Sequence, residues 1–197
     1  MKVDLPEPDG PIKVPAQVLM GAAPAPAPTL PPIVPSPPPT PSPLPSGSAQ
    51  RIVWTSVSNA TVTGSSVRKS SGCDGCDDAG AVSQQLITGD GYMQFTVAET
   101  MLLRSAGLKL SGSPTINFAL RFQTGWVEVR EGGIYRADVP ISPGDVFRIA
   151  VQSGVVRYYR NGVSFYTSGV GATFPLYAVV ALLDLNAAIE NPVIAAF

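Results

Sequence analysis

The sequence predicts an all-β protein: an antiparallel β-sandwich of the jelly-roll type, preceded by an extended, proline-rich N-terminal arm. Two observations predict this fold class. Sixteen of the 21 prolines lie in the first 50 of the 197 residues, and this density excludes a compact domain there because each proline removes a backbone donor and fixes φ. From residue 51 onward, short runs of β-branched and aromatic residues alternate with Gly, Asn, Asp and Ser, without an amphipathic helix of useful length.

The composition divides the chain into three segments. Residues 1–23 mix prolines with aliphatic side chains, residues 24–50 form a linker of mostly Pro, Ala, Ser and Thr, and residues 51–197 form the predicted β-sandwich domain. The run from Pro24 to Pro45 predicts a polyproline II spacer, which is stiff and lacks internal hydrogen bonds. Its 22 residues would span about 70 Å at about 3.1 Å per residue.

The first 23 residues are either a disordered end or an extended peptide that docks on a partner. We favour docking, because a stiff spacer is useful only if the segment at each of its ends folds or binds to a partner. Polar residues between Asp4 and Asp9 interrupt any secretory leader, and no apolar run reaches the roughly 18 residues that cross a bilayer. The anchoring side chains would be Val3, Leu5, Ile12, Val14, Val18, Leu19 and Met20.

Two glycine-containing turns support the β assignment of the domain. Asn161-Gly162 and Gly132-Gly133 each separate apolar-rich runs, and these residue types tolerate the positive φ that tight hairpin turns require. Thirteen strands are predicted, over Arg51–Val57, Ala60–Thr63, Val82–Ile87, Tyr92–Ala98, Met101–Leu108, Thr115–Phe122, Trp126–Glu131, Ile134–Val139, Asp145–Gln152, Val155–Arg160, Val163–Thr167, Leu176–Leu183 and Ala188–Ala196.

Part of the domain resembles a known fold family. Gly144-Asp145-Val146 opens a strand of the "GD-x-hydrophobic" form, and Val156 to Gly162 follow the hairpin pattern "V-x-Y-Y-x-N-G". These features resemble the concanavalin A-like and SPRY-like jelly rolls, and the stretch from Val53 to Phe95 looks like lectin-like modules of bacterial surface and phage structural proteins. The resemblance covers most of residues 51–197 and none of the arm. It implies the fold and a role in glycan binding, protein binding or scaffolding.

The segment from Gly72 to Asp78 reads Gly-Cys-Asp-Gly-Cys-Asp-Asp and admits several interpretations. A redox C-x-x-C would need a helix start in a βαβ setting, and a zinc site would need four ligands where the chain has two Cys and no His. We favour a disulfide that joins Cys73 and Cys76 to each other or to neighbouring chains. The alternative is a calcium loop, although its spacing departs from the EF-hand pattern; its ligands would be Asp74, Asp77 and Asp78.

Exposed aromatic rings are the candidate glycan contacts, because a flat ring suits the apolar face of a pyranose. The candidates are Trp126, Tyr135 and Tyr159, and the alternative for each is a place in the core or in a cross-strand pair. Trp126 is the strongest candidate for exposure, since a Gly precedes it and polar and apolar residues alternate after it.

The sequence argues against catalysis. The absence of His excludes Ser-His-Asp and Cys-His mechanisms, and no phosphate loop, nucleophile elbow or dinucleotide fingerprint is present. Glu128 and Glu131 are glycosidase candidates by residue type only, and surface solvation explains them better. With 13 basic and 14 acidic residues, no basic excess is available for nucleic acid. We therefore expect no enzyme, no cofactor apart from the calcium alternative, and no nucleic-acid partner.

Together these features predict a virion structural protein of a tailed bacteriophage, such as a capsid decoration, head fibre or neck or collar fibre. The arm would anchor it to other virion proteins, and the domain would be displayed for adhesion to host-surface glycans through many weak contacts. The alternatives are a secreted or surface-attached bacterial carbohydrate-binding module and a purely architectural decoration without a ligand. By analogy with fibres we expect a homo-oligomer, such as a trimer, without membrane insertion.

Overall fold

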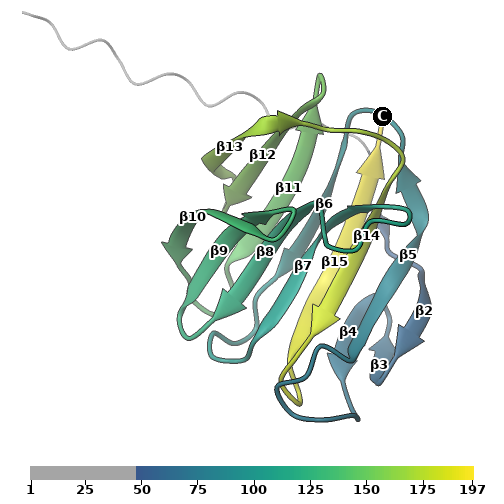
Figure 1. Cartoon of the computed structure of the whole chain (residues 1–197), viewed down its shortest axis with the longest axis vertical. Helices are drawn as coiled ribbons and strands as arrows, with labels where there is room; N and C mark the ends of the chain where they lie inside the picture. The colour runs from purple at the N-terminus through teal and green to yellow at the C-terminus, as the bar shows by residue number, and fades with distance from the viewer. Residues whose placement is uncertain (1–47) are drawn as a thin grey trace, which may run out of the picture. The chain divides into compact units, whose positions relative to one another are not determined.

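The computed structural model describes residues 48–197, which form two antiparallel sheets packed face to face (Figure 1). This part of the chain contains strands and turns but no helix, so the predicted all-β sandwich is confirmed. Within it, no helix is long and apolar enough to cross a membrane. The anchoring side chains between Val3 and Met20, and the spacer up to residue 47, lie outside the described residues.

One sheet has eight strands, and several strands that are neighbours in it, such as β6 and β15, are far apart in the sequence. Strand β1 (Gln50–Arg51) pairs beside the main path with the last strand, β15. The main path runs β13 (Val163–Gly171), β12 (Val155–Arg160), β11 (Val146–Gln152), β6 (Gly91–Thr96), β15 (Ala188–Ala196), β4 (Ser66–Lys69) and β3 (Ala60–Thr63).

The other sheet has seven strands and carries the candidate site. Consecutive strands β7 to β10 lie side by side in it, and β14 from the C-terminal region joins them to β5 and β2. Its order is β10 (Ile134–Pro140), β9 (Trp126–Glu131), β8 (Phe118–Gln123), β7 (Arg104–Leu110), β14 (Leu176–Leu182), β5 (Ala79–Ile87) and β2 (Trp54–Ser58).

Three phenylalanine rings join the two sheets at the centre of the core. Phe95 and Phe147 come from the eight-stranded sheet, Phe122 comes from the seven-stranded sheet, and all three are buried. Phe122 meets Phe95 and Phe147 edge-on, with ring centroids 5.7 and 5.5 Å apart. This geometry suits the charge distribution of aromatic rings. Apolar residues alternate along the strands, and successive side chains point to opposite faces of a sheet. One face of each sheet therefore lies in the core, and the other face is available for function.

The two halves of the motif that resembles concanavalin A-like folds contact each other. The side chain of Asn161, after β12, donates to Asp145 Oδ1 at 2.7 Å and accepts from the N–H of Val146 at 2.8 Å, which ties it to the start of β11. Burial alone would raise the pKa of the Asp145 carboxyl, but hydrogen bonds from Asn161, the Ser142 N–H and Arg160 outweigh it and lower the pKa. These motif residues therefore join the turn after β12 to the start of β11.

The predicted strands differ from the observed ones mainly at the start of the domain. The single strand expected over 51–57 is two strands, because the chain crosses from the eight-stranded to the seven-stranded sheet between Arg51 and Trp54. Strand β4 was not predicted, since Ser66-Val67-Arg68-Lys69 contains only one apolar residue. The two glycine turns are confirmed, with positive φ at Asn161, Gly162, Gly132 and Gly133.

Candidate functional site

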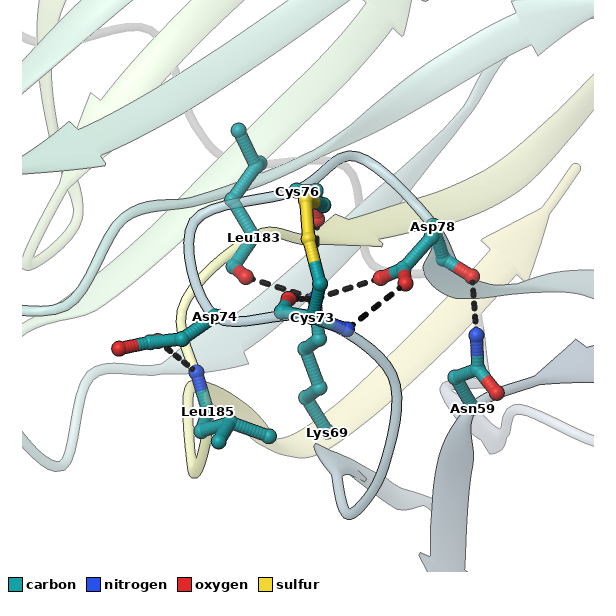
Figure 2. Close-up of a disulfide and its surroundings, with 8 residues drawn as sticks. All are labelled: Asn59, Lys69, Cys73, Asp74, Cys76, Asp78, Leu183 and Leu185. Atoms are coloured by element: carbon teal, nitrogen blue, oxygen red, sulfur yellow. Dashed lines mark hydrogen bonds and ion pairs between the residues drawn. A yellow bond between two sulfur atoms is a disulfide. The ribbon is translucent and has the colours of Figure 1, made fainter.

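The loop from Gly72 to Asp78 closes over the side chain of Lys69, the last residue of β4 (Figure 2). The Lys69 side chain is fully buried, and a buried ammonium is tolerated only when it is paired and hydrogen-bonded. Its Nζ donates to one carboxylate and three backbone carbonyls at 2.6–2.9 Å, and the acceptors are Asp78 Oδ1 and the carbonyls of Cys73, Cys76 and Leu183.

A disulfide closes this loop. The structure joins Cys73 to Cys76 within the chain, with their Cα atoms 5.5 Å apart, which is the first of the two pairings that the sequence leaves open. Gly75, between them, has a φ of 81°, a conformation that glycine adopts without strain. The bridge therefore holds in place the two carbonyls, those of Cys73 and Cys76, that bind the Lys69 ammonium.

The calcium hypothesis for this loop is corrected, because a lysine ammonium occupies the place a cation would take. Asp78 Oδ1 accepts from Lys69 and Oδ2 from the Cys73 N–H, while Asp74 accepts from the Leu185 N–H at 2.8 Å (Figure 2). The hydrogen bond from Lys69, then that from Cys73, lowers the pKa of the Asp78 carboxyl. The three aspartates, Asp77 included, do not converge, and residues 48–197 hold no group of three acidic, Cys or His side chains suited to a metal.

The outer face of the seven-stranded sheet, the side away from the core, carries two rows of small and basic residues. The rows follow from the strand register, because residues paired across strands point to the same side. One row is Glu128, Arg121, Ser105, Ala181, Gly80 and Ser58, and the next is Arg130, Ala119, Gly107, Val179, Val82 and Thr55.

Nine of these twelve residues, all except Glu128, Gly107 and Thr55, line a groove of about 520 Å³. Its floor is made of small side chains, including those of Ser105, Ala119 and Ala181, which leave the strand backbone near the surface. Basic side chains lie at one side, on β7, β8 and β9, and the segment Pro114–Ile116 also lines the groove. Its lining residues come from β9, β8, β7, β14, β5 and β2, so the groove crosses six neighbouring strands.

Two of the basic side chains in the groove have no acidic partner. Arg121 lies directly opposite Glu128, but the Glu128 carboxylate already accepts from Gln123 Nε2 and Arg130 Nε, each at 2.6 Å. Neither Arg121 nor Lys109 forms an ion pair with any residue in the range 48–197. Their positive charges therefore remain available on the groove side of the sheet.

Trp126 lies at the start of β9 on the same outer face and is 49% exposed. Trp126 lines a second hollow together with Gln123, Thr124, Glu128 and Asp138. An open aromatic ring beside amide and carboxylate groups can stack on a sugar ring and hydrogen-bond its hydroxyls.

The other two aromatic candidates, Tyr135 and Tyr159, differ in their exposure to solvent. Tyr135 is also 49% exposed, lies across from Arg130 on β10, and donates its hydroxyl to Asp138 Oδ2 at 2.9 Å, which raises the pKa of that hydroxyl. It is about 13 Å along the hairpin from Trp126, four residues at about 3.3 Å each. Tyr159 is a correction: it is only 3% exposed, because it packs with Tyr92 on the eight-stranded sheet.

The two glutamates considered for glycoside cleavage lie on opposite faces of β9. Glu128 points outward, whereas Glu131 is 4% exposed and accepts from the hydroxyl of Tyr158 and pairs with Arg136 at 3.2 Å. Surface solvation therefore does not explain Glu131, and the carboxylates cannot face each other across a cleft. Burial, followed by the charge of Glu131, raises the pKa of Tyr158.

The sequence did not identify Arg121 and Lys109 as candidate site residues. Alternation along Trp126–Glu131 shows that Trp126, Glu128 and Arg130 share a face, and this signal was available. No local pattern places Arg121 or Lys109 in the same groove, since the register between strands decides it.

Comparison with known proteins identifies the fold and no closer relationship. No family model and no curated protein matches the chain. The exoplasmic/lumenal domain of VIP36, in its Ca²⁺/Man3GlcNAc-bound form, is similar with a TM-score of 0.51 and 11% identity, over 72% of this chain and 82% of that one. The carbohydrate recognition domain of Emp47p (TM-score 0.49, 9% identity, 72% and 87% covered) and Bacillus licheniformis β-glucanase (0.48, 15%, 71% and 82%) also match. The domain thus has the concanavalin A-like jelly-roll fold.

Proposed function

We propose that residues 48–197 form a carbohydrate-binding domain whose binding surface is the outer face of the seven-stranded sheet. The observation that carries this proposal is the half-exposed ring of Trp126 beside Gln123, Glu128 and Asp138. A sugar would stack on the ring and exchange hydrogen bonds with these planar polar groups. The VIP36 structure, which has the same fold, contains Man3GlcNAc, and this supports the proposal.

In this proposal, the domain binds glycan and does not cleave it. Cleavage needs two carboxylates positioned on either side of a glycosidic bond. The two carboxylates of the hollow, Glu128 on β9 and Asp138 on β10, lie directly opposite each other, and the remaining candidate, Glu131, faces the core. Glu128 accepts from Gln123 and Arg130, and Asp138 accepts from the Tyr135 hydroxyl, so both carboxylates are already engaged as hydrogen-bond acceptors.

Replacement of Trp126 tests the proposed binding surface. The full chain is screened on a glycan array, and the affinity for the best ligand is measured by titration calorimetry. We expect Trp126→Ala to weaken binding at least tenfold, or by about 1.4 kcal/mol, because the stacking platform is lost.

Two controls accompany this experiment. Trp126→Phe keeps a ring and should retain most of the affinity, and Val163→Ala, at a position 67% exposed on the eight-stranded sheet, should change nothing. If Trp126→Ala binds as tightly as the wild type, or if no glycan binds, the proposal is wrong.

For the whole chain, we propose a virion structural protein of a tailed bacteriophage that is anchored through its arm and displays this domain for adhesion. The proline-rich composition of residues 24–50 supports the proposal, since a spacer increases the reach of a displayed binding domain. The alternatives remain a secreted or surface-attached bacterial module and an architectural subunit with no ligand. A decoration or fibre would be oligomeric, such as a trimer, which sedimentation of the full chain measures.

Purified phage particles distinguish these roles. We expect the chain to copurify with particles and to be lost from them when residues 1–23 are deleted. Recovery of the full chain free in the medium, and never with particles, would favour the secreted module. Copurification without binding to any glycan would favour the architectural role.

A further inference from the structure

We propose that the groove on the outer face of the seven-stranded sheet binds acidic sugar units, with Arg121 and Lys109 as the residues that contact their anionic groups. This inference rests on the proposed carbohydrate-binding function and names its ligand class. Carboxylate- or sulfate-bearing sugars share the required chemistry, an anionic group on a hydroxyl-rich ring.

The first argument is the charge balance at the centre of the groove. Each oxygen of the Glu128 carboxylate accepts a hydrogen bond at 2.6 Å, one from Gln123 and one from Arg130. Arg121, directly opposite, is left without an ion pair, and its Nε is buried with no hydrogen-bond partner among the described residues. An unpaired, partly buried guanidinium is costly unless a ligand supplies the missing anion.

The second argument is the position of Lys109. It lies on β7, four residues from Ser105, the cross-strand neighbour of Arg121, so about 13 Å along the strand separates Lys109 from Ser105. The row that contains Ala119 lies between them. Two cations at this separation can each contact one anionic unit of an extended chain.

The third argument is the floor between the two cations. The small side chains of Ser105, Ala119, Val179 and Ala181 allow a ligand to approach the sheet closely. Close approach strengthens the attraction between the cations and an anionic ligand, since water is displaced from between them.

Acidic residues of the groove lie at the far rim and do not cancel these charges. The side chains of Asp77 and Asp78 line the groove beside the start of β5, across β14 and β7 from Arg121. Asp78 is already paired with the buried ammonium of Lys69. The β7–β9 side of the groove is therefore the cationic side, and the acidic sugar units lie there.

Matched acidic and neutral oligosaccharides test the inference. The full chain is titrated with an oligogalacturonate, with the methyl ester of the same oligomer, which lacks the charge, and with a chondroitin sulfate oligosaccharide. We expect at least one acidic oligomer to bind tenfold or more tightly than the ester, and its affinity to fall between 50 and 500 mM salt as screening increases.

Variants assign the effect to the groove. Arg121→Gln and Lys109→Gln should each weaken the acidic ligand about tenfold while glycan binding at Trp126 persists. Arg157→Gln is the matched control, because Arg157 lies on β12 in the eight-stranded sheet and should leave the affinity unchanged.

Each outcome has a distinct meaning. If neutral glycans bind and neither acidic oligomer binds more tightly than the ester, the acidic-ligand inference is wrong and the carbohydrate-binding proposal stands. If no sugar binds at all, both fall. If poly-glutamate binds as tightly as the acidic oligomers, the groove is a general anion site and the inference is overturned.

Discussion

At the scale of single residues, Lys69 determines the structure around the disulfide. One buried ammonium joins the end of β4 to the Gly72–Asp78 loop and to Leu183, after β14. A side chain that binds three backbone carbonyls and a carboxylate has the role that a bound metal ion has in other loops. The charge of Lys69 is therefore part of the fold.

Lys69→Met should destabilise the domain strongly. The change leaves three backbone carbonyls and the half-buried Asp78 carboxylate without the Lys69 donor, and each buried acceptor left unsatisfied costs about 1–3 kcal/mol. Urea unfolding of the variant measures this loss. Lys109→Met, on the outer face, is the control and should change stability by less than about 0.5 kcal/mol. A loss below about 1 kcal/mol for Lys69→Met would show that the loop does not depend on the ammonium.

Two carboxyl groups predict how stability depends on pH. The native structure lowers the pKa of Asp78 and of Asp145 below their ordinary value of 3.8. A group whose pKa is lower in the folded state stabilises that state fully above its unfolded pKa, and the contribution disappears as the pH falls through the folded pKa. Unfolding free energy should therefore be nearly constant from pH 7 to about 5 and decrease below about pH 4.

The matched variant for this pH dependence is Asp145→Asn. It lacks the titrating group, so its stability should be lower at pH 7 but should decrease less steeply below pH 4 than that of the wild type. Equal slopes for the two proteins would contradict the assignment to Asp145.

At the scale of elements, the disulfide stabilises one loop, whereas the sequence pattern of strand β9 determines which of its side chains face outward. The disulfide joins residues only three apart, so it restricts a very short loop, and loop-closure entropy predicts about 2 kcal/mol of stabilisation. The double variant Cys73→Ser/Cys76→Ser should lose about that amount in urea unfolding, less than Lys69→Met loses. A reductant should destabilise the wild type and leave the double variant unchanged. A variant as stable as the wild type would contradict this prediction.

Strand β9 shows how far local pattern predicts a site. Its alternation places Trp126, Glu128 and Arg130 outward and Val127 and Val129 in the core, and its predicted bounds are the observed ones. The choice of Tyr159 as an exposed glycan contact was wrong, and alternation could not have corrected it. Alternation states which side chains share a face, but it cannot state whether other side chains cover that face.

At the scale of the whole molecule, the chain carries a formal charge of −1, yet its charges are not evenly spread. The net value excludes a generally basic surface, but it does not exclude a local groove where Arg121 and Lys109 form no ion pair with any residue from 48 to 197. Several acidic side chains elsewhere are paired with basic ones, as Asp145 is with Arg160 and Glu190 with Arg68. The class of ligand that the groove can bind thus depends more on which charged side chains are paired than on the overall composition of the chain.

The sequence by itself determined the all-β class, most strands and both glycine turns, because alternation and turn chemistry act between residues close in the chain. It also limited the disulfide to Cys73 and Cys76, although not to one pairing. Only the tertiary structure decided that Lys69 occupies the loop, that Tyr159 is buried, and that Arg121 remains unpaired. The burial of Tyr159 depends on a strand far away in the sequence. The position of Lys69 depends on the conformation of the loop that follows it, and the pairing around Arg121 depends on the register of β8 and β9, which no local pattern specifies.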